Sequence, residues 1–316
     1  MISRRLLRIK TLQVLFAFFK AENDSLPKAE SELLHSIKKG YDLYHLLFLL
    51  LLDIRNFAER RIETARQKHV PMHDDLNPNT RFVDNPLFKL IEENESISQY
   101  VSKNTLNWVN HPELIKKIYQ KIVASDYFAK YMQVETCEFT QHRQILVNIL
   151  SKELMDFEDF TLWLEEQSIY WNDDLDFMVG MVVKTLKKFE ENQSTDTPVF
   201  PMYKNEEDED FAKRLLRKVV LRHSENTKTI DQYTKNWDVE RIASMDNLIL
   251  EMAITEITEF PSVPVKVSFN EYIEISKYYS TDQSSMFING VLDKIILTLR
   301  SEGLINKQGR GLVGEE

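Results

Sequence analysis

Glycine is scarce in this sequence. The chain of 316 residues has seven glycines, and four of them lie within residues 303–316. Only Gly40, Gly180 and Gly290 remain for the body of the chain. Sheet-rich folds use glycine in their turns, and phosphate-cradling loops need it where the backbone approaches the ligand. The shortage argues against both, and it favours an all-α fold over a nucleotide-dependent enzyme.

Cysteine is nearly absent as well. Cys137 is the only one, which excludes an intrachain disulfide and a cysteine-based zinc site. The first residues lead into a predicted helix and not into the small-residue cleavage site of a signal peptide. We therefore expect a reducing, cytoplasmic location.

The sequence has no long hydrophobic run. The most apolar stretch, Leu46 to Leu52, is interrupted by Asp53 and Arg55. A membrane-spanning helix needs roughly 20 apolar residues. This stretch is therefore predicted to be a buried helix, and no membrane partner is expected.

Patterns that carry catalysis or bind metals are also missing. His69 and His73 have the spacing of a helical metal pair, but Pro71 lies between them and interrupts the helix. There is no Gly-x-x-x-x-Gly-Lys loop and no serine nucleophile elbow. The acid run 206–210 is interpreted as solvated surface. We predict no catalytic residue, no metal site and no cofactor, and hence a protein that is not an enzyme.

Positive charge is concentrated at the amino terminus. The net charge is −10, yet residues 1–20 contain five basic side chains and no acid. On a helix that turns about 100° per residue, Arg4, Arg5 and Arg8 fall within an arc of roughly 100°. These arginines can face one polyanion together.

Apolar periodicity predicts helices along almost the whole chain. They are expected over 3–22, 29–69, 86–106, 112–132, 137–166 and 173–191, followed by a proline-containing linker over 192–205. Two apolar stripes then lie within 211–220 and 242–257. Ser268 and Glu271 have the spacing of a helix-capping box. The tail from Gly303 is predicted to be disordered.

Two segments near the carboxyl terminus form a recognisable motif. Residues 261–279 read Pro-Ser-Val-Pro-Val-Lys-Val-Ser-Phe-Asn-Glu-Tyr-Ile-Glu-Ile-Ser-Lys-Tyr-Tyr, and residues 284–293 read Ser-Ser-Met-Phe-Ile-Asn-Gly-Val-Leu-Asp. They resemble the carboxyl-terminal signature of the NusB family of bacterial transcription antitermination factors. Arg4-Arg5-x-x-Arg8, followed by Gln13-x-Leu15-Phe16, resembles the arginine-rich first helix of that family.

The resemblance covers part of the chain and implies a domain division. Residues 1–22 correspond to the first NusB-like helix and residues 206–300 to the NusB-like core. Residues 23–205 form a helical insertion of unknown role, and residues 301–316 form the disordered tail. The implied fold is all-α, with NusB-like helical bundles and an inserted or extended helical region.

The implied function is RNA binding in transcription antitermination. Family members bind the boxA element of ribosomal RNA leaders together with the ribosomal protein NusE, within the antitermination complex of RNA polymerase. On this resemblance the RNA-binding residues are Arg4, Arg5, Arg8, Lys277, Gln283 and Phe287, and Phe16 is the partner-binding residue. Core packing is the alternative for both phenylalanines. Asn270, Glu271, Asn289 and Gly290 are expected to be structural, with Gly290 allowing a close helix approach.

Other functions compete with this one. The family often has a basic residue at the position of Met286, so this chain lacks one expected phosphate contact. The alternative is a protein-interaction scaffold with little RNA binding of its own. NusB-like domains also precede some RNA cytosine methyltransferases, but those need a glycine-rich cofactor loop that this sequence lacks. The sequence leaves the oligomeric state open between a monomer and a homodimer.

Overall fold

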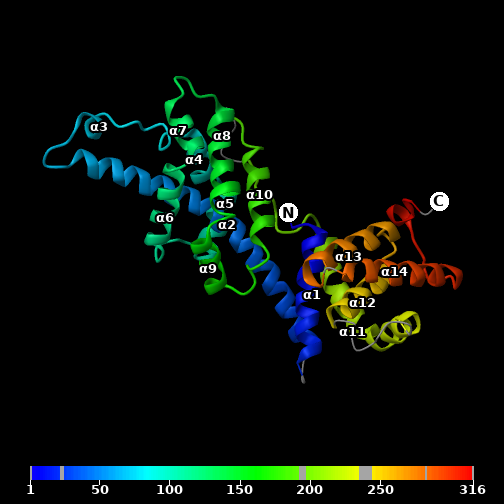
Figure 1. The fold of residues 1–316 in the computed structure, drawn as a ribbon. Helices are drawn as coiled ribbons and strands as arrows, with labels where there is room; N and C mark the ends of the chain where they lie inside the picture. The colour runs from blue at the N-terminus through cyan, green and yellow to red at the C-terminus, as the bar shows by residue number, and fades with distance from the viewer. Residues whose placement is uncertain (1, 22–24, 192–196, 235–243, 282, 315–316) are drawn as a thin grey trace. The chain divides into compact units, whose positions relative to one another are not determined.

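The chain divides into two compact helical units. The computed structural model describes residues 2–21, 25–191, 197–234, 244–281 and 283–314 (Figure 1). Apart from Met1, residues 38–202 form the middle unit, and residues 2–37 with 203–316 form the terminal unit. The sequence places the corresponding divisions at 22/23 and 205/206. All regular structure in the described ranges is helical, so the predicted all-α fold is confirmed.

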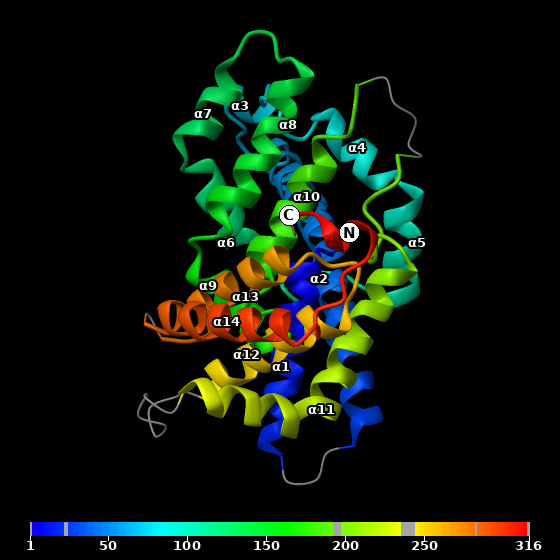
Figure 2. The same cartoon turned by 90° about the vertical axis from the view of Figure 1, so that its right-hand side faces the viewer.

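The terminal unit is built around α12. Its elements are α1 (Arg4–Lys20), the first part of α2 (Leu26–Arg66), α11 (Glu206–Thr234), α12 (Ser244–Glu259), α13 (Val265–Tyr279), α14 (Ser284–Ser301) and the short 3-10 helix η3 (Gly309–Leu312). The helix α12 packs against α1, α11, α13 and α14, as the two views show (Figures 1 and 2). Because neighbours cover nearly all of its sides, α12 buries polar as well as apolar residues.

The predicted apolar stripes form the core of this unit. On α14, Phe287, Val291, Leu292, Ile295, Ile296 and Leu299 are all buried. On α11, Phe211, Leu215, Leu216 and Val219 are buried. Residues spaced three and four apart share one helix face, which is why the sequence pattern located these faces correctly.

The helix α13 begins earlier than a capping box would allow. Pro264 is its N-cap residue, so Ser268 and Glu271 lie inside the helix. The Ser268 hydroxyl donates to Glu256 Oε1 at 2.7 Å, and Glu271 accepts from Arg5 at 2.8 Å. The capping-box prediction is therefore wrong, because both side chains bond other helices.

The tail packs against the loop that follows α12. The amide of Gln308 donates to the carbonyl of Pro261 at 3.0 Å, and Lys307 Nζ donates to the carbonyl of Phe260 at 3.0 Å. A Cβ at Gly311 would lie 1.9 Å from the Pro261 carbonyl oxygen, so only glycine fits there. Contrary to the predicted disorder, the structure describes ordered backbone as far as Gly314.

The middle unit surrounds the remainder of α2. Its helices are α3 (His73–Leu76), α4 (Pro86–Glu92), α5 (Glu95–Asn104), α6 (Pro112–Val123), α7 (Asp126–Gln133), α8 (Phe139–Asn148), the π-helix η1 (Ile149–Glu153), α9 (Glu158–Gln167) and α10 (Leu175–Leu186). Leu47, Phe48, Leu50 and Leu51 are 0% exposed, so the predicted buried helix is confirmed. No described helix is long and apolar enough to cross a membrane.

Two predicted helices of the middle unit are each split by a polar cap. Asn94 separates α4 from α5, and its side chain accepts from the Ile97 amide at 3.1 Å. Ser125 separates α6 from α7 and accepts from the Phe128 amide at 3.4 Å. Both residue types favour N-cap positions, so the signal was present within an otherwise helical pattern. Of the predicted linker, 192–196 lies outside the described residues, and 197–205 is non-helical.

Aromatic rings fill the core of the middle unit. The ring centroids of Trp108 and Trp163 are 4.4 Å apart, and the Trp108 indole Nε1 donates to the Leu46 carbonyl at 2.9 Å. His45 is 0% exposed and stacks on Tyr100 with ring centroids 4.0 Å apart. Burial lowers the pKa of His45 to about 4.

Candidate nucleic-acid interface

The arginine-rich start of α1 lies against α11, α12 and α13 within the terminal unit. The Ser3 side chain caps the helix by accepting from the Leu6 amide at 3.2 Å. This cap fixes the first turn, from which Arg4, Arg5 and Arg8 extend. Each of the three arginines then meets a carboxylate from a distant part of the sequence.

Arg8 is part of a buried polar network. Its Nε and Nη2 donate to the two carboxylate oxygens of Glu256 at 2.8 and 2.6 Å, and both residues are nearly inaccessible. Glu256 also accepts from Ser268 and from the Tyr272 hydroxyl at 2.9 Å. Burial alone would lower the pKa of Arg8, but the Glu256 carboxylate outweighs it and leaves the pKa raised. Arg8 is therefore not placed to touch RNA. The predicted direct RNA contact does not fit Arg8, because its side chain is buried and pairs with Glu256.

Arg5 is the most accessible of the three arginines. Its side chain is 49% exposed, and its Nε and Nη2 each donate to a carboxylate oxygen of Glu271 at 2.8 Å. That hydrogen bond raises the pKa of Arg5. Burial opposes the shift at Glu271, but Arg5 and Arg8 together hold its pKa below the ordinary value. Arg5 thus joins the start of α1 to the exposed side of α13.

Arg4 is held by the acidic start of α11. Its Nε donates to Asp208 Oδ1 at 2.9 Å, and its guanidinium lies 5.1 Å from the centre of the Phe211 ring. Asp208 is only 5% exposed. The acid run 206–210 is therefore not simply solvated surface, because one of its members anchors an arginine of α1. The side chain of Arg4 remains 33% exposed.

The exposed side of α13 carries two carboxylates, each of which pairs with a basic side chain. Glu271 pairs with Arg5, and Glu274 pairs with Lys277 one turn later. Tyr278, next to Lys277, is 80% exposed. An exposed aromatic ring beside a lysine can stack on an unpaired base. The sequence patterns did not predict Tyr278 as a site residue. Its only signal in the sequence is the Lys-Tyr-Tyr run at the end of the motif.

The residues predicted on α14 separate into exposed and buried groups. Gln283 and Met286 are exposed at the start of the helix. Phe287 is 9% exposed and belongs to the core stripe, so the core alternative describes it better than an RNA-stacking role. Gly290 is exposed, and a Cβ there would meet nothing within 4 Å. The predicted close helix approach at Gly290 is wrong.

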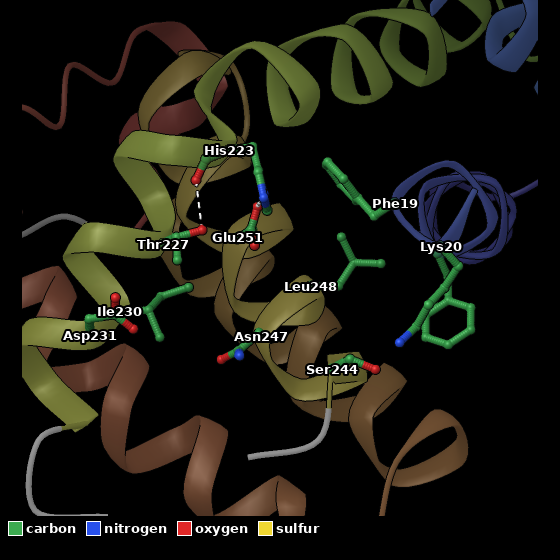
Figure 3. A pocket seen from close by; sticks show the side chains of 11 residues that line it. Phe19, Lys20, His223, Thr227, Ile230, Asp231, Ser244, Asn247, Leu248 and Glu251 are labelled. Atoms are coloured by element: carbon green, nitrogen blue, oxygen red, sulfur yellow. Dashed lines mark hydrogen bonds and ion pairs between the residues drawn. The ribbon is translucent and has the colours of Figure 1, made fainter. Parts of the chain in front are cut away.

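Phe16 lies on the far end of α1 from the arginines. It is half-buried, and Lys20 Nζ lies 5.6 Å from the centre of its ring. It lines a pocket together with Phe19 and His223 (Figure 3). The predicted RNA-binding and partner-binding residues of α1 therefore occupy opposite ends of one helix.

No group of three or more histidine, cysteine or acidic side chains that could hold a metal ion occurs in the part of the chain that the structure describes.

Comparison with known proteins identifies the family. A family model described as NusB family matches residues 180–297. The chain is 44% identical over 114 residues to the transcription antitermination protein NusB of Salinibacter ruber, covering 36% of this chain and 71% of that protein. The chain belongs to the NusB family. It is a family of transcription antitermination proteins.

Other NusB proteins match over shorter lengths. The identity is 40% over 104 residues with NusB of Chloroherpeton thalassium, covering 33% of this chain and 49% of that protein. It is 42% over 91 residues with NusB of Symbiobacterium thermophilum, covering 29% of this chain and 60% of that protein. No solved structure matches the chain. The NusB family match begins within α10 and ends within α14, so most of the middle unit lies outside it.

Proposed function

We propose that this protein acts in transcription antitermination by binding boxA-type RNA of ribosomal RNA leaders. It does so through the terminal unit, together with the ribosomal protein NusE in the antitermination complex of RNA polymerase. The observation that carries the proposal is the contact between Arg5 and Glu271. It joins the arginine-rich start of α1 to the helix that carries the family motif.

The proposed RNA contacts are the accessible members of this surface. Arg4, Arg5 and Lys277 provide positive charge, Gln283 adds an exposed amide, and Tyr278 adds a stacking surface. Arg8 and Phe287 are buried and are not among these contacts. Single-stranded RNA is bound through phosphate contacts and base stacking, which this set of side chains supplies.

The carboxylates that pair with the basic residues of this surface should limit its affinity for RNA. Arg4, Arg5 and Lys277 each have a carboxylate partner in the protein. A phosphate must replace or share that partner, so only part of the attraction between arginine and phosphate appears as net affinity. We therefore expect weak RNA binding by the chain alone and tighter binding when NusE adds its own contacts.

Arg5→Ala tests the proposal against a closely matched control. Arg217 is also about half exposed and also pairs with a glutamate of the terminal unit, Glu30. Arg5→Ala should weaken binding to a boxA-type RNA about tenfold, as expected for a charge-assisted contact to phosphate. Arg217→Ala, which removes the same charge, should leave affinity within about twofold. Equal affinities for the two variants would contradict the proposal.

A salt titration separates RNA binding from the alternative, a protein-interaction scaffold. The ion pairs of α13 and the burial of Arg8 favour the scaffold, because they leave little unbalanced positive charge. Each phosphate contact on single-stranded RNA contributes a slope of about −0.7 in log K against log salt. Two or three contacts predict a slope of roughly −1.4 to −2.1. A slope near zero would favour the scaffold.

A further inference from the structure

The last turns of α2, in the middle unit, carry a basic face. Phe57, Arg60 and Arg61 fall within an arc of roughly 100° on this helix. The neighbouring acids Glu59 and Glu63 lie outside that arc. Both arginines are exposed, and this stretch lies outside the residues that match the NusB family model. The face is therefore a feature of the middle unit that the NusB-like motifs do not supply.

The helix α6 adds an aromatic ring to this face. It lies beside the last turns of α2, where the Arg61 guanidinium is 5.6 Å from the centre of the Tyr119 ring (Figure 1). The Phe57 ring meets Tyr119 with centroids 5.3 Å apart. Lys116 is exposed and precedes Tyr119 by three residues, so the two side chains are neighbours on α6. The Tyr119 ring thus supports the guanidinium of Arg61 through a cation–π contact.

The arginines of this face differ from those of α1 in their partners. Arg4 and Arg5 each pair with a carboxylate. Within the described residues, neither Arg60 nor Arg61 forms an ion pair. Asp53 is the acid that acts on Arg60 from a greater distance: burial raises the pKa of Asp53, and Arg60 opposes that shift. A polyanion bound here would displace no paired carboxylate from either arginine, so more of the attraction would appear as affinity.

The combination of a flat cation and positive charge selects the kind of polyanion. A guanidinium plane supported by an aromatic ring offers a stacking surface to an unpaired base. Arg60 and Lys116 add positive charge beside it for phosphates. The ion pair of Lys116 with Glu113, at 3.0 Å, is exposed on both sides and is therefore weak. An acidic protein or an anionic membrane would use the charges but would leave the stacking surface unused.

We propose that the middle unit binds single-stranded RNA on this face, with a base stacked on Arg61 and phosphates held by Arg60 and Lys116. The inference goes beyond the proposed function, whose RNA contacts lie in the terminal unit. The two sites share a class of ligand and have no residue in common. The second site gives the region outside the family match a role of its own.

Binding of a labelled oligouridine to the full chain tests the inference, because this RNA has unpaired bases and no boxA sequence. Arg61→Lys keeps the charge and removes the guanidinium plane, so it should weaken binding about fivefold to tenfold. Arg66→Lys makes the same change at an exposed arginine on the opposite side of α2. This control should leave the affinity within about twofold. Equal affinities for the two variants would overturn the inference.

The salt dependence of oligouridine binding separates stacking from charge. Arg61→Lys should leave the slope of log K against log salt unchanged. Arg60→Ala should make the slope shallower by about 0.7, the contribution of one phosphate contact on a single strand. Polyglutamate and anionic vesicles serve as competitors that carry charge without bases. If either competes as well as unlabelled oligouridine, the face binds acids in general and the inference fails.

Two RNAs keep the inference separate from the proposed function. Arg61→Lys should leave the affinity for a short boxA-type RNA within about twofold, and Arg5→Ala should do the same for oligouridine. A wild-type chain that binds boxA-type RNA but not oligouridine would overturn the inference alone. Oligouridine binding that Arg61→Lys weakens, with no preference for boxA-type RNA, would support the inference and overturn the proposed function. Circular dichroism of each variant confirms that the helices are retained.

Discussion

The two units bury different chemistry. The terminal unit places charged side chains in its interior, including Arg8, Glu256 and Asp208, and satisfies them with partners from other helices. The middle unit packs aromatic rings around α2, and its buried His45 and Asp42 form hydrogen bonds with Tyr41 and Tyr100 instead of with a buried arginine. Apolar packing tolerates substitutions of similar size, whereas a buried ion pair requires both partners in one geometry. The buried ion pairs of the terminal unit therefore hold the side chains that carry its proposed function in one geometry.

The largest expected effect comes from breaking the buried ion pair. Glu256→Ala leaves the Arg8 guanidinium buried without its carboxylate. This should lower the free energy of unfolding by about 3–5 kcal/mol. Denaturant titration measures the change, and hydrogen exchange should locate it in α1, α12 and α13. In a second variant, Arg8→Met combined with Glu256→Leu should recover most of the loss, because apolar residues then replace both charges. If Glu256→Ala hardly changes the free energy of unfolding, the terminal unit does not depend on its buried ion pair, and the contrast with the middle unit fails.

The apolar core of the terminal unit provides the next test. Phe287→Ala removes a ring from the α14 stripe and should lower the free energy of unfolding by about 3 kcal/mol. The folded fraction of the variant should bind RNA with unchanged affinity, because Phe287 lies in the core. Loss of RNA affinity at unchanged stability would restore the RNA-stacking role.

The middle unit should be sensitive to acid through His45. Its pKa is about 4 in the folded chain and about 6.5 in the unfolded chain, so below pH 6.5 the unfolded state binds more protons. The stability contributed by neutral His45 is present above pH 6.5 and is lost as the pH falls toward 4. The loss is about 3 kcal/mol. His45→Phe should flatten this part of the stability profile measured by urea titration. If His45→Phe leaves the dependence of stability on pH unchanged, the acid sensitivity does not come from His45.

The smallest expected effect concerns the charge balance of the proposed RNA surface. Glu271→Gln removes the carboxylate that holds Arg5 and should tighten RNA binding about threefold to tenfold, a gain of about 1 kcal/mol. Glu30→Gln, which releases Arg217 in the same way, should leave RNA affinity unchanged. Fluorescence anisotropy with labelled RNA measures both variants. Weaker binding by Glu271→Gln would show that the acid positions Arg5 and does not compete with phosphate.

Periodicity in the sequence located most of the fold. The spacing of Phe287, Val291 and Ile295 identified the buried face of α14, and the apolar run from Leu46 identified the centre of α2. Helix breaks at Asn94 and Ser125 were missed because one polar residue hardly alters an apolar pattern over twenty positions. The NusB-like motifs in the sequence correctly indicated the family.

The chemistry of the candidate site was less predictable. A helical wheel places Arg4, Arg5 and Arg8 on one arc, but it does not show which side of that arc the neighbouring helices cover. Arg8 meets Glu256 across 248 positions of the sequence, so no local pattern indicates the pair. Tyr278 is a large aromatic residue of a kind that cores often hold, yet its side chain is 80% exposed.

The contact at Gly311 makes the end of the chain sensitive to a single methyl group. An alanine there would collide with the same Pro261 carbonyl that accepts the Gln308 amide, so this point of attachment would be lost. The Lys307 contact with the Phe260 carbonyl would then be the remaining described side-chain attachment of this segment. In a segment whose composition resembles a dispensable tail, one position accepts no side chain at all.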